Sequence, residues 1–144
     1  MSFSIAFSQA FEISSYIGIK SKEQQYKYLT IQQISKKLNI PIPSIKKISV
    51  LLKKNGILKS KTGAFGGLQL AKPANEISIY DILVSIEGSN PLFKIHTNFD
   101  TNIFINQKKV ENWLQESSKV LNDAENAMLA ILKKTSLEDI ALKI

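Results

Sequence analysis

The stretch from Thr30 to Ala71 constrains the fold of this chain more than any other part of the sequence. Its first segment has apolar residues at helical spacing, namely Ile31, Ile34 and Leu38. Thr30 is a favourable N-cap, and Gln33 three residues later completes a capping box, in which each side chain bonds the backbone of the other residue. Asn39 tolerates a positive φ, so the segment predicts a short helix that ends in a sharp corner.

A second helix is predicted directly after the corner, from Ile42 to about Lys54. Pro41 and Pro43 stand at its first turn, where the backbone N–H groups lack intrahelical partners and proline is tolerated. Helical spacing turns Ile45, Ile48, Leu51 and Leu52 inward, and it leaves Pro43, Ser44, Lys46, Lys47 and Val50 pointing outward. Asn55-Gly56 then closes the helix with a left-handed cap.

A short hairpin follows the second helix. We interpret Ile57 to Ser60 and Leu68 to Ala71 as its two strands. The tip between them is rich in glycine and flanked by lysine, with Gly63, Gly66 and Gly67 and with Lys59 and Lys61. Two helices with a tight corner and a following hairpin indicate a winged helix-turn-helix, which places its second helix in the DNA major groove.

The positive charge of the chain is concentrated in the half that holds this motif. The 144 residues carry a formal net charge of +7. From Met1 to Lys61 there are eleven Lys and two acids, whereas from Thr62 to Ile144 there are eight Lys and ten acids. All nineteen positive residues are Lys, and there is no Arg. A basic half of this kind indicates a polyanionic partner, although basic composition alone also fits a membrane surface or plain solubility.

Helices are also predicted on either side of the motif. Before it, one helix face is marked by Phe3, Ala6, Phe7, Ala10, Ile13 and Ile17. This helix is expected to end near Gly18, and a loop follows from Lys20 to Tyr28. After the motif, Ser78 caps a helix that ends at Gly88. Ser136 is expected to cap a last short helix that carries Leu137, Ile140 and Leu142.

The longest predicted element lies near the C-terminus and carries an apolar seam, repeated every three to four positions from Val110 to Ile131. A helix of this length spans roughly 30 Å, which is too long for its whole stripe to rest on a small winged domain. A twofold partner is the economical solution. We therefore expect a homodimer interface at Val110, Trp113, Leu114, Val120, Leu121, Ala124, Met128 and Ile131. The alternative is that the seam packs on its own chain.

The composition argues against an enzyme. The chain has no Cys, which removes disulfides, thiolate nucleophiles and Cys-ligated zinc or iron–sulfur sites. Its single His, His96, stands in no catalytic constellation, and the sequence has no phosphate-binding glycine loop and no HExxH-like pattern. We read no signal peptide, and no run approaches the roughly 18 apolar residues of a spanning helix. A cytoplasmic protein of one domain is expected.

The order of these parts resembles the Rrf family of bacterial winged-helix transcription regulators, which includes IscR, NsrR and CymR. The resemblance covers most of the chain. It is carried by LTIQQISKKLNI (Leu29–Ile40), KKNGILKS (Lys53–Ser60), GAFGGLQLAKP (Gly63–Pro73) and ISIYDILVSIEG (Ile77–Gly88). The resemblance implies a dimeric DNA-binding regulator, usually a repressor, that often senses redox or metabolic signals.

The chain departs from the family pattern at three places. Several relatives carry three Cys after the wing helix, and these hold an iron–sulfur cluster. The corresponding residues 91–106 contain no Cys here, so we expect a member of the family without a cluster. Thr62 stands where the wing usually has Arg, and Ser8 stands where a basic residue is common near the start of the first helix. Lys59 and Lys61 could compensate in the wing.

The expected fold class is mainly α, with a winged helix-turn-helix, a two-stranded β wing and a long C-terminal dimerisation helix. Residues 1–88 would form the DNA-binding part, 89–102 a loop and 103–144 the dimerisation and last helices, all within one compact domain. The expected DNA contacts are Thr30, Gln32, Gln33, Pro43, Ser44, Lys46, Lys47, Lys59, Lys61, Thr62 and Gly63.

The function predicted from these features is a transcription regulator, usually a repressor, that binds a palindromic operator as a homodimer. A twofold dimer implies operator half-sites about 34–36 Å apart, or a multiple of this. A small-molecule or redox signal would regulate it. The alternative function is a winged-helix module that docks another protein and does not bind DNA.

Overall fold

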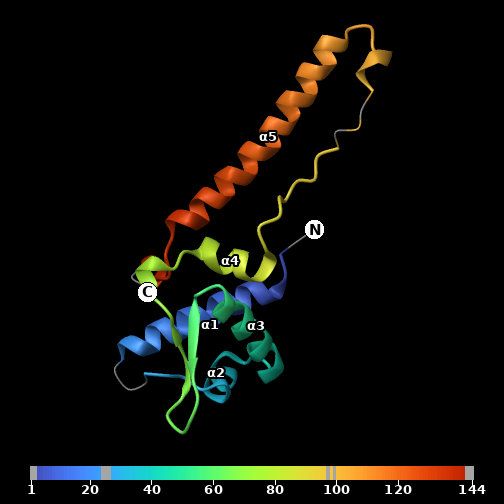
Figure 1. Ribbon diagram of the computed structural model, residues 1–144. Coiled ribbons are helices and arrows are strands. Elements are labelled where there is room, and N and C mark those ends of the chain that lie inside the picture. Colours follow the sequence, from blue (N-terminus) through green and yellow to red (C-terminus); the bar gives the residue numbers. More distant parts are fainter. Residues whose placement is uncertain (1–2, 24–26, 97, 99, 142–144) are drawn as a thin grey trace. The chain divides into compact units, whose positions relative to one another are not determined.

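The computed structural model describes residues 3–23, 27–96, 98 and 100–141 (Figure 1). Residues up to 89, together with those from 132 onward, form one compact unit, and residues 90–131 form a second. The helices, the two-stranded wing and the long C-terminal helix confirm the predicted fold class. None of the described helices is long and apolar enough to cross a membrane.

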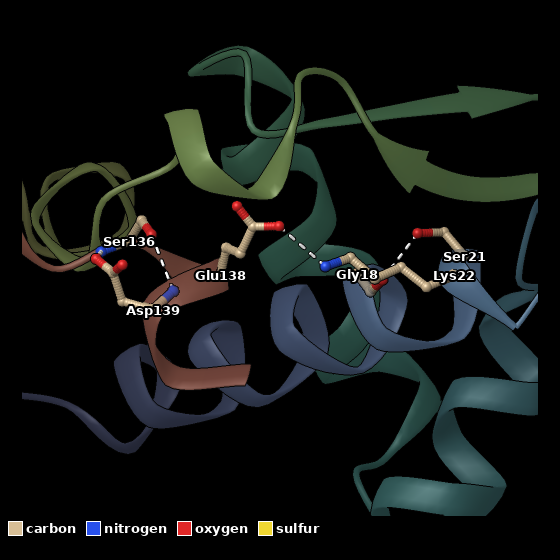
Figure 2. Close-up of polar contacts among 6 residues, drawn as sticks. All are labelled: Gly18, Ser21, Lys22, Ser136, Glu138 and Asp139. Carbon is tan, nitrogen blue, oxygen red and sulfur yellow. Dashed lines mark hydrogen bonds and ion pairs between the residues drawn. The ribbon is translucent and has the colours of Figure 1, made fainter. Parts of the chain in front are cut away.

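Helix α1 runs from Ile5 to Lys22 and buries Ala10, Ile13 and Ile17 on one face. The predicted end at Gly18 is wrong, because the helix continues through Lys22. Gly18 is buried and faces Leu70, whose Cδ1 would lie 3.2 Å from a Cβ at this position. The glycine therefore allows close packing and does not end the helix. Ser21 Oγ donates to the Gly18 carbonyl at 2.8 Å within the added turn (Figure 2).

Helix α2 (Ile31–Leu38) begins at the predicted capping box. Thr30 Oγ1 accepts from the Gln33 backbone N–H at 3.1 Å, and Gln33 Oε1 accepts from the Thr30 N–H at 2.9 Å. These two bonds satisfy two of the donors that a helix N-terminus otherwise leaves without a partner. The short-range sequence signal is thus sufficient to fix where α2 starts.

Helix α3 (Ile42–Lys54) follows the predicted corner and has the predicted bounds. Asn39 turns the chain with φ 54° and ψ 44°, which is the left-handed conformation that asparagine tolerates. Ile40 is buried after the corner, and its carbonyl accepts from Ser35 Oγ at 2.7 Å. This hydrogen bond connects the corner to α2.

The C-terminal end of α3 is closed by a Schellman motif. Gly56 has φ 74°, whereas Asn55 has φ −97°, so the left-handed residue of the predicted cap is the glycine. The Ile57 N–H donates to the Leu52 carbonyl at 2.9 Å, and the Gly56 N–H donates to the Lys53 carbonyl at 3.1 Å. The chain leaves the helix directly into the wing.

The wing consists of antiparallel strands β1 (Leu58–Lys61) and β2 (Gly67–Leu70). Each strand is displaced by one residue from the predicted range, β1 toward the C-terminus and β2 toward the N-terminus. Ile57 is excluded from β1 because its N–H already closes α3. Its carbonyl still accepts from the Ala71 N–H at 2.9 Å, so backbone pairing continues one step past both strands.

Gly67 lies where the wing meets the start of α2. Leu29 and Leu68 exchange backbone hydrogen bonds of 2.9 and 2.7 Å, which bring the chain before α2 alongside β2. Gly67 has φ 143°, and a Cβ on it would clash with the Leu29 carbonyl. Only glycine fits this position without moving the wing.

We predict that Gly67→Ala lowers the free energy of unfolding by at least about 2 kcal/mol, because alanine must adopt a positive φ and also displace the Leu29 backbone. Gly56→Ala is the matched control. It has φ 74° but nothing within 4 Å of a Cβ. Its expected loss is only about 1 kcal/mol. Urea unfolding followed by circular dichroism measures both, and equal losses would contradict the steric explanation.

Helix α4 (Ile79–Glu87) follows a 3-10 turn, η1 (Ala74–Glu76). Ser78 caps it as predicted: its Oγ accepts from the Asp81 N–H at 3.0 Å, and Asp81 Oδ2 accepts from the Ser78 N–H at 2.9 Å. The helix ends before Gly88, also as predicted. Ile79 and Ile82 are buried on its inner face.

Helix α6 (Leu137–Ala141) returns to the first unit and begins at the predicted cap. Ser136 Oγ accepts from the Asp139 N–H at 3.0 Å. Figure 2 shows this cap together with an ion pair in which Lys22 Nζ of α1 lies 3.0 Å from Glu138 Oε1 of α6. The ion pair therefore connects α6 to α1.

The core of the first unit joins side chains from all of these elements, and it is almost entirely aliphatic. The buried residues that pack together in its main cluster are Ala10, Ile13, Ile17, Leu29, Ile34, Ile40, Ile45, Ile48, Leu52, Ile57, Leu58, Leu68, Ile77, Ile79, Ile82 and Leu137. Ile140 of α6 packs against this cluster, partly buried. Leu142, also predicted for the last helix, lies outside the described residues.

Helix α5 (Gln107–Lys134) has 28 residues, and all of them up to Ile131 belong to the second unit. A 3-10 turn, η2 (Thr101–Ile103), precedes it. Glu125 accepts from the Leu92 backbone N–H and so holds the segment before η2 to the helix. Lys119 Nζ donates to the Asp123 carboxylate at 2.7 Å, and this hydrogen bond raises the pKa of Lys119.

Candidate nucleic-acid interface

The side chains on the outward face of α3 are mostly small or basic. Lys46 and Lys47 are exposed, whereas Ile45, Ile48 and Leu52 on the opposite face are buried in the core. These three apolar residues fix the rotation of the helix, so both lysines are kept in solvent. Two other predicted DNA contacts lie on this face: Pro43 is exposed and Ser44 is half-buried. Val50, which is also predicted to point outward, is exposed.

No carboxylate of this region competes for the lysines. The sequence has no Asp or Glu between Glu23 and Glu76, and this stretch holds ten Lys. It covers α2, α3 and both strands of the wing. Within the part of the chain that the structure describes, neither Lys46 nor Lys47 forms an ion pair. Uncompensated lysines release counterions from DNA when they meet its phosphates, which favours binding.

The N-terminus of α2 offers fewer free groups than the sequence suggests. The capping box occupies the backbone N–H groups of Thr30 and Gln33. A phosphate at this helix end would therefore meet the remaining N–H groups of the first turn and the exposed side chain of Gln32.

The wing presents all of its predicted contacts to solvent: Lys59, Lys61, Thr62 and Gly63 are exposed. Lys59 and Lys61 share one face of β1, because side chains two apart in a strand point the same way. Lys61 Nζ also lies 5.8 Å from the centre of the Tyr28 ring, a cation–π contact that orients this side chain.

Phe65 is a further candidate contact that sequence reasoning did not predict. It lies at the tip of the wing and is 90% exposed. The available signal is an aromatic residue placed among glycines in a turn, four residues after Lys61. A turn can be inferred from those glycines, but the exposure of the ring becomes visible only once the wing is built.

The predicted dimer-interface residues lie along α5, and none of the residues of this helix is buried. Trp113, Val120 and Ile131 are 63%, 64% and 57% exposed. Ala124 is exposed as well. The other four predicted interface residues are half-buried, namely Val110, Leu114, Leu121 and Met128. A single chain therefore leaves much of the apolar seam of α5 in contact with water.

A family model described as "Rrf2: Iron-dependent Transcriptional regulator" matches residues 3–143. The chain belongs to the Rrf2 family. The match confirms the resemblance drawn from the sequence. As a member of this family the protein is a DNA-binding transcription regulator and not an enzyme.

Individual relatives of this Rrf2 protein agree with the family match. YffB of Lactococcus lactis, named as a candidate HTH-type transcriptional regulator, is 29% identical over 108 residues, which are 75% of this chain and 68% of YffB. The regulator NsrR of Halalkalibacterium halodurans is 27% identical over 125 residues, 87% of this chain and 80% of NsrR. The fold matches CymR, the global cysteine regulator of B. subtilis, with a TM-score of 0.75 and 21% identity, covering 100% of this chain and 98% of CymR.

The family description names iron, but the residues of this Rrf2 protein do not suit an iron–sulfur cluster. The sequence has no Cys to provide thiolate ligands and a single His. In the described residues, no three His, Cys, Asp or Glu side chains gather where they could hold a metal ion.

Proposed function

We propose that this protein is a repressor that binds a palindromic operator as a homodimer. The observation that carries the proposal is the lysine face of α3, held outward by buried Ile45, Ile48 and Leu52 in a stretch free of acids. In the winged-helix mode of binding, α3 would lie in the major groove. Ser44, Lys46 and Lys47 would then lie nearest the base edges.

The absence of Arg determines how such a protein would recognise DNA. Arg and Lys are the side chains that most often contact guanine, and Arg does so with a planar fork that Lys lacks. Lysine supplies a point charge instead, so phosphate contacts and DNA shape would provide much of the affinity. Operator binding should accordingly weaken steeply with added salt.

The exposed seam of α5 supports the homodimer. Trp113 and Val120 would each be buried on formation of a twofold interface, and burying a large apolar side chain stabilises by roughly 1.5–3 kcal/mol. A twofold axis would also place two α3 helices on an operator with matching symmetry.

The regulating signal would reach this protein as a bound small molecule, because the chain has no thiol to oxidise. A cavity of about 380 Å³ lies between α1 and α6, lined in part by Gly18, Ile19, Leu137 and Ile140. Its volume is in the range of small-molecule sites. Glu138, which pairs with Lys22, also lines it.

Selection of genomic fragments on the purified protein, followed by sequencing, tests the proposed function. The expected result is a small set of sharp peaks that share an inverted repeat and lie in promoter regions. Uniform recovery of fragments, without any shared sequence, would contradict a specific operator. Recovery of no fragment at low salt would favour a module that docks protein.

A further inference from the structure

The tip of the wing is a tight turn with Phe65 at its outer end. The Gly66 N–H donates to the Gly63 carbonyl at 3.1 Å, which closes a four-residue turn around Ala64 and Phe65. Gly63 has φ 107°, and a Cβ on Gly66 would clash with the Lys61 carbonyl. The turn is therefore built from residues that permit close approach of the backbone, and the ring projects from a defined position.

Folding of this chain does not account for the position of Phe65. It is 90% exposed, more than any other Phe or Trp among the described residues. Burying such a ring would stabilise the fold, and the wing leaves this gain unused. A single exposed apolar residue is ordinary in itself, but this one is presented by a wing that also carries two exposed lysines, Lys59 and Lys61.

These features match a known way of deforming DNA. Proteins that bind the minor groove often insert an apolar side chain such as Phe between two base pairs, which partly unstacks them and kinks the duplex. Arg is the residue that commonly enters a narrow minor groove, and this chain has none. Lys59 and Lys61 could bind the phosphates on either side of an inserted ring. In the view of Figure 1 the hairpin tip extends past α2.

We propose that Phe65 is an apolar wedge that enters the minor groove next to the α3 half-site and partly unstacks a flexible pyrimidine–purine step. The proposal rests on the proposed function, because it needs an operator to act on. It adds an element of specificity: operators with a TA or CA step at the wing would be preferred over those with a stiff A-tract there.

The test compares Phe65→Ser and Phe65→Leu with the wild-type protein on fragments recovered from the genomic selection. Affinity is measured by mobility shift at several salt concentrations, DNA bending by circular permutation, and unstacking by the fluorescence of 2-aminopurine placed at the step. Phe65→Ser should lose affinity about tenfold and lose most of the bend and the fluorescence increase. Phe65→Leu should retain most of each effect, because leucine also serves as a wedge.

The salt dependence separates the wedge from a charge contact. Phe65→Ser should leave the slope of affinity against salt unchanged, since no phosphate contact is removed. If Phe65→Ser binds, bends and unstacks the operator as the wild type does, the wedge is refuted while the proposed function stands. If the wild-type protein shifts no genomic fragment at low salt, both are refuted.

Discussion

Replacing both Lys46 and Lys47 by Ala should weaken operator binding about a hundredfold at moderate salt. Both side chains lie on the outward face of α3, and no carboxylate between Glu23 and Glu76 neutralises them. Where one of these lysines contacts a phosphate, its loss should also reduce the slope of log affinity against log salt by about 0.9. A mobility-shift titration at four or more salt concentrations measures both quantities.

The control for this experiment is Lys108→Ala with Lys109→Ala. This pair has the same charge and the same spacing and is also exposed, but it lies at the start of α5. The pair Lys133 and Lys134 at the other end of α5 is less suitable, because Lys133 Nζ lies 4.7 Å from the centre of the Tyr80 ring and so has a structural contact to lose. Equal losses for the two pairs would mean that affinity follows net charge and that α3 does not read the operator.

Introducing Glu at Trp113 and Val120 together should convert the proposed dimer into a monomer and lower operator affinity by at least about a hundredfold, because the two half-sites can then no longer be bound as one unit. The side chains are 63% and 64% exposed in the single chain. The free energy of unfolding of the monomer should therefore change by no more than about 0.5 kcal/mol. Light scattering after size exclusion gives the molar mass, and a mobility shift gives the affinity.

Gln115→Glu with Asn122→Glu is the matched control for the seam. These exposed residues have the same separation on the same helix, and helical spacing places them on the opposite face from Trp113 and Val120. This variant should remain dimeric and bind the operator with nearly wild-type affinity. A wild-type protein that is monomeric at the concentration of the assay would refute the interface directly.

The parts of the fold that the sequence predicts well are those set by contacts within four residues. The capping boxes at Thr30, Ser78 and Ser136 and the corner at Asn39 each depend on a side chain that bonds or turns the adjacent backbone. Such signals need no knowledge of the rest of the chain. This is why α2, α3 and α4 begin where the sequence places them.

The structure differs from the sequence-based prediction where a residue far away in the chain determines the local conformation. Gly18 is typical of a helix end, yet in the structure it lies within α1 and packs closely against Leu70 of the wing. The strand bounds depend on Ile57, whose N–H is committed to α3, and on Leu29, which pairs with β2. A periodic pattern holds no information about these contacts, because each joins residues from different elements.

The same distinction between local signals and long-range contacts holds for the candidate site. Helical spacing is enough to place Lys46 and Lys47 on the outer face of α3, since the buried isoleucines fix its rotation. The sequence motif is enough to infer that the Thr30 and Gln33 backbone N–H groups bond within a capping box. The motif does not show which N–H groups then remain for a phosphate. The exposure of Phe65 depends on how the turn from Gly63 to Gly66 closes.

Hydroxyl-radical footprinting of the wild-type protein on a selected genomic fragment, at low ionic strength, is the most direct test of a twofold dimer that lays α3 in the major groove. We expect two protected regions related by a dyad, with centres about 34–36 Å apart or a multiple of this. A single protected region without symmetry, or no protection at all, would contradict this mode of binding.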